Sequence, residues 1–277
     1  MSLGRILINL LAMILILLGL SPYALIMLLA FSEKPTSIQG FTIDNFAFIA
    51  TGKLLQDPRY SHIYPNIHAA LVNTLFLALG VSFLVTLLSS MTGYALSRYP
   101  VPGRRAILAT VLALHGIPVI ILLIGLYFVL RFIGLFNTLI GVILAKVVLD
   151  LPLGIWIMKN FYDNLPWDIE IASIVDGAGR FTTWLRIMLP LAKPGIAALA
   201  VLEFISGWGE FILVYTLVTS NTNWTLSMVI RGLIGEMGSV NLNLLAALSI
   251  FYLIPVLIFF IATQKYLLRI AFGGVRG

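Results

Sequence analysis

Six long apolar segments dominate this sequence of 277 residues. About 20 helical residues cross the ~30 Å apolar core of a bilayer, and every segment reaches that length. They run over residues 6–31, 68–97, 106–130, 138–160, 196–220 and 243–268. Only 10% of the residues are charged and 60% are hydrophobic, whereas a soluble domain carries roughly 25% charged residues. The sequence therefore predicts an all-α polytopic membrane protein with six transmembrane helices and no soluble catalytic domain.

The first apolar segment is expected to stay in the mature protein as a transmembrane helix. Arg5 precedes it, as a basic residue precedes the apolar run of a signal peptide. Its apolar core of about 25 residues is longer than the roughly 7–15 of a cleaved signal. No clear small-x-small cleavage site follows it.

Lys and Arg are unevenly divided between the two sides of the predicted membrane. With the N-terminus inside, eleven lie on the inner side and five on the outer side. The inner set is Arg5, Arg98, Arg104, Arg105, Lys159, Arg180, Arg186, Lys193, Lys265, Arg269 and Arg276, and the outer set is Lys34, Lys53, Arg59, Arg131 and Arg231. Cytoplasmic loops are enriched in these residues, which predicts a cell-membrane protein with both termini in the cytoplasm. This asymmetry accounts for the net charge of +6, so the charge does not indicate nucleic-acid binding.

Residue types that many enzymes need are missing or scattered. The absence of cysteine excludes disulfides, thiol nucleophiles and thiolate metal sites. His62, His68 and His115 are too dispersed to suggest a metal cluster, and no GxxxxGK[ST] loop for nucleotide phosphates occurs. No Ser/His/Asp set can be assembled. We therefore expect no catalytic residue, no metal and no cofactor bound by this chain.

Besides Lys159 and Lys265 near segment ends, four charged residues lie inside the apolar segments. Lys146 and Asp150 are four residues apart, so they share a helix face, and an unpaired charge there would cost about 2.5–3.5 kcal/mol. We expect them to pair or to face the protein interior. Glu203 and Glu210 share a face of the fifth segment beside Trp208. They either make polar contacts between helices or line a hydrophilic pathway.

The second segment is rich in small and hydroxylated residues. They are Ser82, Thr86, Ser89, Ser90, Thr92, Gly93 and Ala95. Such residues let helices approach closely and form hydrogen bonds between them. The segment either packs against its neighbours through this face or uses the face to line a pathway.

A polar loop between Pro166 and Pro194 interrupts the apolar sequence. Eight charged residues fall between Lys159 and Lys193. Pro166 suits the start of a helix, and Asp168 and Glu170 place negative charge near its positive end. Apolar residues recur at helical spacing on one face of this helix: Trp167, Ile171, Ile174, Val175 and Ala178.

Gly177 and Gly179 are predicted to end that helix and turn the chain. A second short helix is expected from Phe181 to Met188, stopped by Leu189 and Pro190. Two short helices at an angle form a knob, residues 166–190, that can occupy a groove of another protein. An interfacial helix on lipid headgroups is the alternative.

The knob resembles the cytoplasmic signature of the permease subunits of ATP-binding-cassette (ABC) importers. That signature is E-A-A, three residues, Gly, nine residues and I-x-L-P; Gly177, Ile187, Leu189 and Pro190 stand at the required spacings. The position of the motif glutamate holds Ile171, and the acid comes one residue earlier, at Glu170. The motif alanines correspond to Ala172 and Ser173.

The resemblance extends over most of the chain. The matching segments are Asn73-Thr-Leu, Gly93-Tyr-Ala-Leu-Ser-Arg98, Pro102-Gly-Arg-Arg, Trp208-Gly-Glu-Phe and Gln264-Lys-Tyr-Leu-Leu-Arg, ending in Gly274-Val-Arg-Gly277. Trp208-Gly-Glu-Phe is similar to the family's W-N-[DE]-F, and the C-terminus is similar to the maltose- and trehalose-type (MalG-like) sugar permeases. The resemblance implies a first helix with an external segment in 1–67, a permease core in 68–271 containing a coupling loop at 159–194, and a cytoplasmic tail at 272–277.

The resemblance also implies a type I importer permease fold and its partners. These are a second, longer (MalF-like) permease subunit, two ABC ATPase subunits that bind ATP and Mg, an external solute-binding protein near 221–241, and membrane lipid. The implied ATPase-coupling residues are Trp167, Glu170, Ile171, Ala172, Ser173, Asp176, Gly177, Ala178, Arg180 and Pro190. Candidates for the substrate pathway are Asn73, Glu203, Trp208 and Glu210.

Import of a di- or oligosaccharide is the function that this resemblance implies. A permease of the same class for polyamines or another solute is one alternative. A stand-alone, ion-coupled secondary carrier is the other alternative, but it does not explain the spacing of the motif residues in the knob.

Overall fold

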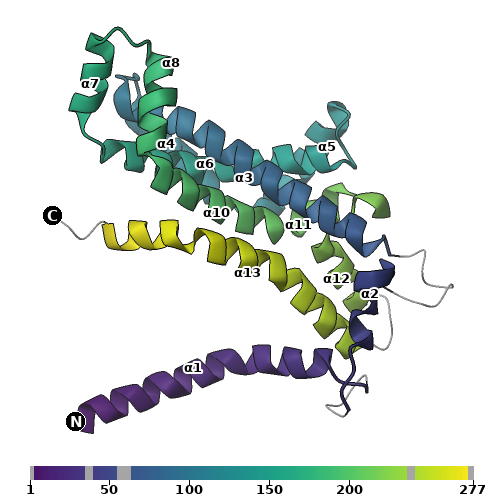
Figure 1. The fold of residues 1–277 in the computed structure, drawn as a ribbon. Helices are drawn as coiled ribbons and strands as arrows, with labels where there is room; N and C mark the ends of the chain where they lie inside the picture. The colour runs from purple at the N-terminus through teal and green to yellow at the C-terminus, as the bar shows by residue number, and fades with distance from the viewer. Residues whose placement is uncertain (1–2, 35–39, 55–63, 236–240, 274–277) are drawn as a thin grey trace. The chain divides into compact units, whose positions relative to one another are not determined.

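The computed structural model describes residues 3–34, 40–54, 64–235 and 241–273, which contain helices and no strand (Figure 1). Within these residues, four helices are long and apolar enough to cross a membrane: α1 (Leu3–Ala30), α3 (Ile67–Arg98), α6 (Leu139–Asp163) and α13 (Leu242–Gly273). The number of spans rises to six if each of two bent pairs counts as one span: α4 (Arg104–His115) with α5 (Val119–Phe132), and Arg180–Leu191 with α10 (Lys193–Trp208). The predicted all-α membrane fold is confirmed.

The third and fifth apolar segments are each interrupted in the structure. α4 and α5 meet at 98°. Pro118 lacks an N–H and disfavours helical backbone at the preceding residue, so the helix breaks there. In the fifth segment α10 ends at Trp208, and a separate helix, α11 (Ile212–Leu217), follows Gly209. The bend at Pro118 arises from local backbone chemistry that hydropathy does not report.

One compact unit comprises residues 1–68 and 229–255. After α1 the chain forms a 3₁₀ turn, η1 (Asp44–Phe46), and then α2 (Ala47–Thr51). The side-chain amide of Asn243 donates hydrogen bonds to the carbonyls of Ser32 (2.6 Å) and Lys34 (2.8 Å). These bonds hold the chain that follows α1 against the start of α13.

The second unit comprises residues 69–228 and 256–277 and contains the knob. Its core consists of apolar residues from α3, α5, α6 and α11. After α6 come α7 (Trp167–Val175), α8 (Arg180–Thr183), a π-helical turn η2 (Trp184–Met188) and α9 (Leu189–Leu191). After α11 come η3 (Asn221–Asn223) and α12 (Leu226–Gly235), which extends into the first unit. Part of the predicted loop 221–241 and residues 274–277 of the predicted tail lie outside the described residues.

Small residues bring α3 and α6 into close contact. A Cβ on Gly93 would lie 2.8 Å from the Lys159 backbone nitrogen, and one on Gly154 would meet the Ser89 hydroxyl. Ser90 is 1% exposed, and its hydroxyl is hydrogen-bonded to the Tyr162 hydroxyl at 2.8 Å. This part of the small-residue face in the second segment serves helix packing.

Gly93→Val should destabilise the protein because the added methyl groups would push α3 away from α6. Overpacking of this kind costs about 1–3 kcal/mol, which corresponds to a decrease of several degrees in the thermal midpoint. The midpoint is measured on detergent-purified protein by size-exclusion chromatography after heating. Gly125→Val on α5 is the matched control, because nothing lies within 4 Å of its added Cβ. Equal midpoints for the two variants would contradict the close approach.

Candidate functional site

The knob begins as the sequence predicts. Pro166 caps α7, and Asp168 and Glu170 lie in its first turn. The helix ends at Val175, and Gly177 then adopts a φ of 84°, a left-handed conformation that a side chain would strain. The chain turns there and enters α8. The predicted glycine turn between two helices is confirmed.

Pro190 does not stop the second helix of the knob, contrary to the prediction that this helix ends at Met188. α8 continues as the π-helical turn η2 and then as α9 through Pro190 to Leu191. The Leu189 N–H donates to the carbonyl of Trp184, five residues earlier. Pro190 has no N–H to donate, and the wider π-helical turn before it lets the helix continue through this residue.

The knob exposes several large apolar side chains. Its exposed apolar side chains are those of Trp167, Ile171, Ile174, Val175, Phe181 and Leu185. Val175 is 79% exposed, although it lies in a segment with many polar residues. Clustered exposed apolar side chains mark contact sites for other proteins or for a membrane.

A buried ion pair connects the knob to the end of α3. The Nε atom of Arg98 lies 3.2 Å from Oε2 of Glu170, and the two side chains are 0% and 3% exposed. The Tyr94 hydroxyl donates to Oε1 of Glu170 at 2.8 Å. Arg98 also donates to the carbonyls of Tyr162 (2.7 Å) and Leu165 (2.8 Å). One arginine thus binds α7 and the chain that leads into it.

Two cation–π contacts lie beside this ion pair. The guanidinium of Arg98 on α3 stacks on the ring of Trp167 on α7, and that of Arg180 on α8 stacks on Tyr99. In each case the guanidinium carbon lies 4.6 Å from the ring centre, within the range of a cation–π interaction. Both helices of the knob are therefore attached to the end of α3.

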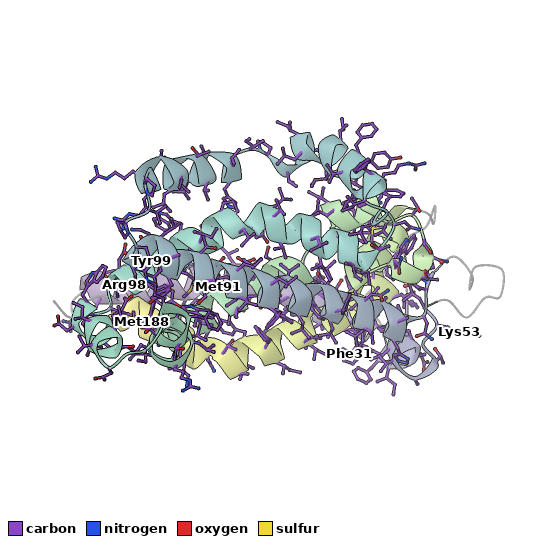
Figure 2. The ribbon with its side chains drawn as sticks, turned by 90° about the horizontal axis from the view of Figure 1, so that it is seen from above. Phe31, Lys53, Met91, Arg98, Tyr99 and Met188 are labelled. Carbon is purple, nitrogen blue, oxygen red and sulfur yellow. The ribbon has the colours of Figure 1, made fainter. Side chains whose placement is uncertain are left out.

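A small core fills the space beneath these contacts. Its buried members are Tyr94, Met158, Tyr162, Trp184, Met188, Ala192 and Leu199, and Tyr99 packs against them. Figure 2 labels Arg98, Tyr99 and Met188 close together in this region. The knob is therefore seated on the spans and is not a separate loop.

Eight of the ten predicted coupling residues have exposed or half-buried positions: Trp167, Ile171, Ala172, Asp176, Gly177, Ala178, Arg180 and Pro190. Glu170 and Ser173 are the exceptions, at 2% and 4% exposed. The Ser173 hydroxyl is hydrogen-bonded to that of Thr183 at 2.8 Å, which joins α7 to α8. These two side chains hold the knob together from within and do not form its surface, and the coupling role of all ten residues stays a prediction.

Arg98 and Tyr94 are functional candidates to which the sequence alone assigns no role. In the sequence, Arg98 is a positive charge at the end of a span. The signal that could have found it is the segment Gly93-Tyr-Ala-Leu-Ser-Arg98, which contains both residues. Its partner Glu170 lies 72 positions later, so spacing alone could not connect them.

Two of the predicted pathway residues have structural contacts. The Asn73 side-chain amide donates to the carbonyls of Thr222 (2.8 Å) and Trp224 (2.9 Å). Trp208 is 2% exposed and stacks on Phe204.

The two predicted pathway glutamates belong to one charge cluster with Lys146 and Asp150. The Lys146 ammonium lies 3.2 Å from Asp150 and 3.2 Å from Glu210, so the predicted Lys146–Asp150 pair is confirmed. Glu203 on α10 contacts Asp150. Among the described residues, no group of three or more His, Asp or Glu residues has the arrangement of a metal site.

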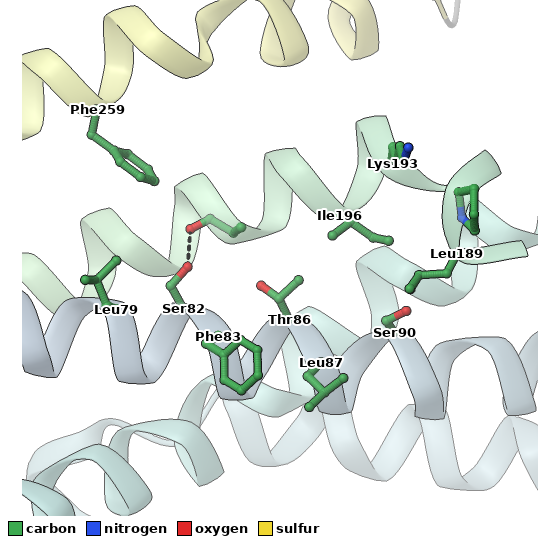
Figure 3. A pocket seen from close by; sticks show the side chains of 12 residues that line it. Leu79, Ser82, Phe83, Thr86, Leu87, Ser90, Leu189, Lys193, Ile196 and Phe259 are labelled. Carbon is green, nitrogen blue, oxygen red and sulfur yellow. Dashed lines mark hydrogen bonds between the residues drawn. The ribbon is translucent and has the colours of Figure 1, made fainter. Parts of the chain in front are cut away.

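A separate, apolar cavity of about 520 Å³ lies between α3 and the α9–α10 segment, with Phe259 of α13 on its wall (Figure 3). Ser82 is one of the hydroxyl residues that line it, and its hydroxyl donates to the carbonyl of Ala200 at 2.7 Å. This bond uses the hydroxyl within the protein and leaves a mostly apolar wall.

The fold is that of the membrane subunit of an ABC importer. A chain of the bacterial ABC transporter for the acidic polysaccharide alginate superposes with a TM-score of 0.79 at 21% identity, covering 95% of this chain and 96% of that one. A chain of the MetNI methionine ABC transporter gives a TM-score of 0.58 at 20% identity, covering 72% and 93%. At such identities the likeness establishes the fold.

Sequence comparison identifies the family. Residues 86–270, more than half of the chain, match the family described as binding-protein-dependent transport system inner membrane component, and this chain belongs to that family. Its relatives are transport permeases and not enzymes.

Three relatives illustrate the similarity. The diacetylchitobiose uptake system permease protein NgcG of Streptomyces coelicolor is 31% identical over 79% of this chain and 77% of that protein. The trehalose transport system permease protein SugB of Mycobacterium tuberculosis is 30% identical, over 92% and 93%. The trehalose/maltose transport system permease protein MalG of Thermococcus litoralis is 28% identical, over 99% and 98%.

Arg98→Met should lower the free energy of unfolding by about 3–5 kcal/mol, because it leaves the Glu170 carboxylate buried without its counter-ion. Adding Glu170→Leu should restore much of that loss, because the second change removes the isolated charge. Thermal denaturation of the two single variants and the double variant in detergent tests this coupling. Additive losses would show that the two side chains do not act as a pair.

Proposed function

We propose that this chain is a permease subunit of an ATP-driven importer that carries a di- or oligosaccharide delivered by an external binding protein. The main support is membership of the binding-protein-dependent inner membrane family. The printed names of its relatives supply the solute class, since they name diacetylchitobiose, trehalose and maltose. One of the similar solved structures is a complex of the alginate transporter with an alginate pentasaccharide-bound periplasmic protein.

The proposed assembly contains a second, longer permease subunit, two ABC ATPase subunits and the binding protein. ATP and Mg bind to the ATPases, and this chain binds no nucleotide. We place both termini and the knob in the cytoplasm, because eleven Lys and Arg residues then lie inside and five outside. The loop near 221–241 then faces the binding protein.

The knob is the proposed contact with an ATPase. Its apolar side chains suit a groove on a partner, in the way that an amphipathic helix docks. Closure of the ATPases would move the knob, and the Arg98–Glu170 pair would pass that movement to α3. The spans would then rotate as semi-rigid bodies between inward- and outward-facing states.

Two other functions make different predictions. A polyamine permease of the same class would import spermidine in place of sugars. An ion-coupled carrier would transport its solute without any ATPase, and an exposed apolar knob would then have no partner protein.

Val175→Cys should form a cross-link with a cysteine in the groove of an ATPase subunit, with a yield that changes when ATP binds. The chain contains no native cysteine, so the introduced cysteine is its one reactive thiol. Ser173→Cys, two residues away and 4% exposed, is the matched control and should not react. The docking proposal fails if Val175→Cys, Ile171→Cys and Phe181→Cys never cross-link in a complex that transports.

Proteoliposomes with the complete complex and its binding protein should accumulate labelled trehalose, maltose or diacetylchitobiose only when ATP is present. A Walker-lysine variant of the ATPase is the control and should abolish uptake, because the energy comes from the partner. Uptake driven by an ion gradient without ATP would identify a carrier. ATP-dependent uptake of spermidine but of no sugar would change the solute class.

A further inference from the structure

The apolar cavity between α3 and the α9–α10 segment begins at the knob and runs along the spans. Lys193 and Leu189 lie at one end of it, and Leu79 and Phe259 lie at the other (Figure 3). The Phe259 ring of α13 stacks on that of Phe204 on α10 with the ring centres 3.9 Å apart, so α13 closes the cavity near this second end. All the residues that line the cavity belong to the second unit.

Small side chains on one face of α3 leave the space open. Ser82, Thr86 and Ser90 follow one another at intervals of four residues, so they share a helix face, and all three line the cavity. The Ser82 hydroxyl donates to the carbonyl of Ala200, and the Ser90 hydroxyl is hydrogen-bonded to that of Tyr162. These two hydroxyls are therefore used within the protein. The remaining wall suits a hydrocarbon, whereas a sugar would find few hydrogen-bond partners.

The cavity is open along one side. Leu79 and Phe83 on its wall are 52% and 65% exposed. Apolar walls give water no hydrogen-bond partner, and an empty space forfeits the dispersion contacts of the atoms that surround it. In a bilayer, hydrocarbon chains are available to fill such a space.

The dimensions fit one lipid chain. The eleven residues from Leu79 to Ser90 extend over about 17 Å of helix, close to the ~15 Å depth of one leaflet. A methylene chain about 5 Å across occupies roughly 330 Å³ over this length, and the cavity holds about 520 Å³. An α-helix about 10 Å across would need roughly 1,300 Å³. The cavity therefore has room for an acyl chain and not for a further helix.

Lys193 supplies a positive charge at the end beside the knob. It lines the cavity and is exposed, and no salt bridge among the described residues includes it. The proposed topology places this end at the cytoplasmic side of the membrane, where anionic lipid headgroups attract basic residues. A lysine stem packs along apolar surface while its ammonium reaches the headgroups. The cavity thus combines hydrocarbon walls with one cation at its headgroup end.

We propose that this cavity binds one acyl chain of an anionic phospholipid, with the lipid phosphate at Lys193. The chain extends from Lys193 toward Leu79 and Phe259 and fills the space between α3 and α10 beside the knob. The inference goes beyond the proposed transport function, and only the assignment of the lipid to the inner leaflet rests on the proposed topology.

Photo-cross-linking of the complete transporter in phosphatidylcholine liposomes tests the site. The probe is a trace of phosphatidylglycerol with a diazirine at the end of one acyl chain, and phosphatidylcholine with the same chain is the matched control lipid. Mass spectrometry should locate phosphatidylglycerol adducts at residues 79–83 and at Phe259. The control lipid should give about fivefold fewer adducts there, the factor that one basic residue contributes toward an anionic headgroup. Ile120 and Ile124 on α5, which are 67% and 71% exposed, should react equally with both lipids.

Lys193→Gln should reduce the phosphatidylglycerol adducts in the cavity about fivefold, to the level of the control lipid. Arg105→Gln is the matched control variant, because Arg105 is another exposed basic residue on the same side of the membrane and does not line the cavity. It should leave the adducts unchanged. Size-exclusion chromatography confirms that both variants assemble, and the comparison of the two lipids on the unaltered protein needs no variant.

The inference is overturned if both lipids label the cavity equally, or if Lys193→Gln leaves the adducts unchanged. It is also overturned if Ile120 and Ile124 react while the cavity does not, because a different chain then covers the cavity. ATP-dependent sugar uptake by the same liposomes reports separately on the proposed function. Uptake without selective labelling rejects the lipid site alone, and selective labelling without uptake of any sugar rejects the function alone.

Discussion

The position of the knob depends on the buried ion pair between Arg98 and Glu170. Neither charge is accessible to solvent, so each requires the other, and removal of one leaves a buried charge without compensation. Stacking of Arg98 on Trp167 and of Arg180 on Tyr99 holds the same two helices to the end of α3. Because these contacts are costly to break, a displacement of the knob is passed on to α3. The knob and the span should therefore move together.

Apolar length predicted α1, α3, α6 and α13 because a long apolar run has few alternatives to a membrane helix. The Lys146–Asp150 pair was predictable because both members share a face of one helix. The breaks of the third and fifth segments were not predictable from hydropathy. Proline alone does not mark them, because Pro22, Pro152 and Pro255 lie within continuous helices while Pro118 stands at a bend.

The knob shows which structural features a sequence motif can predict and which it cannot. Its spacing predicted two helices and a glycine turn, and these depend on local backbone preferences. The inward direction of Glu170 could not be predicted, because it depends on an arginine far away in sequence. Ile171, which takes the place of the motif glutamate, is 53% exposed. Glu170, the acid one residue before the motif position, stabilises the interior of the knob. The exposed residue at the motif position itself is apolar.

The ion pair within α6 has a consequence for how the protein is made. Lys146 and Asp150 belong to one helix, so a newly synthesised α6 carries its own counter-ion when it partitions into the bilayer. The segment that contains Glu203 and Glu210 is translated later and joins a charge that is already compensated. Membrane integration of α6 therefore does not have to wait for its final neighbours.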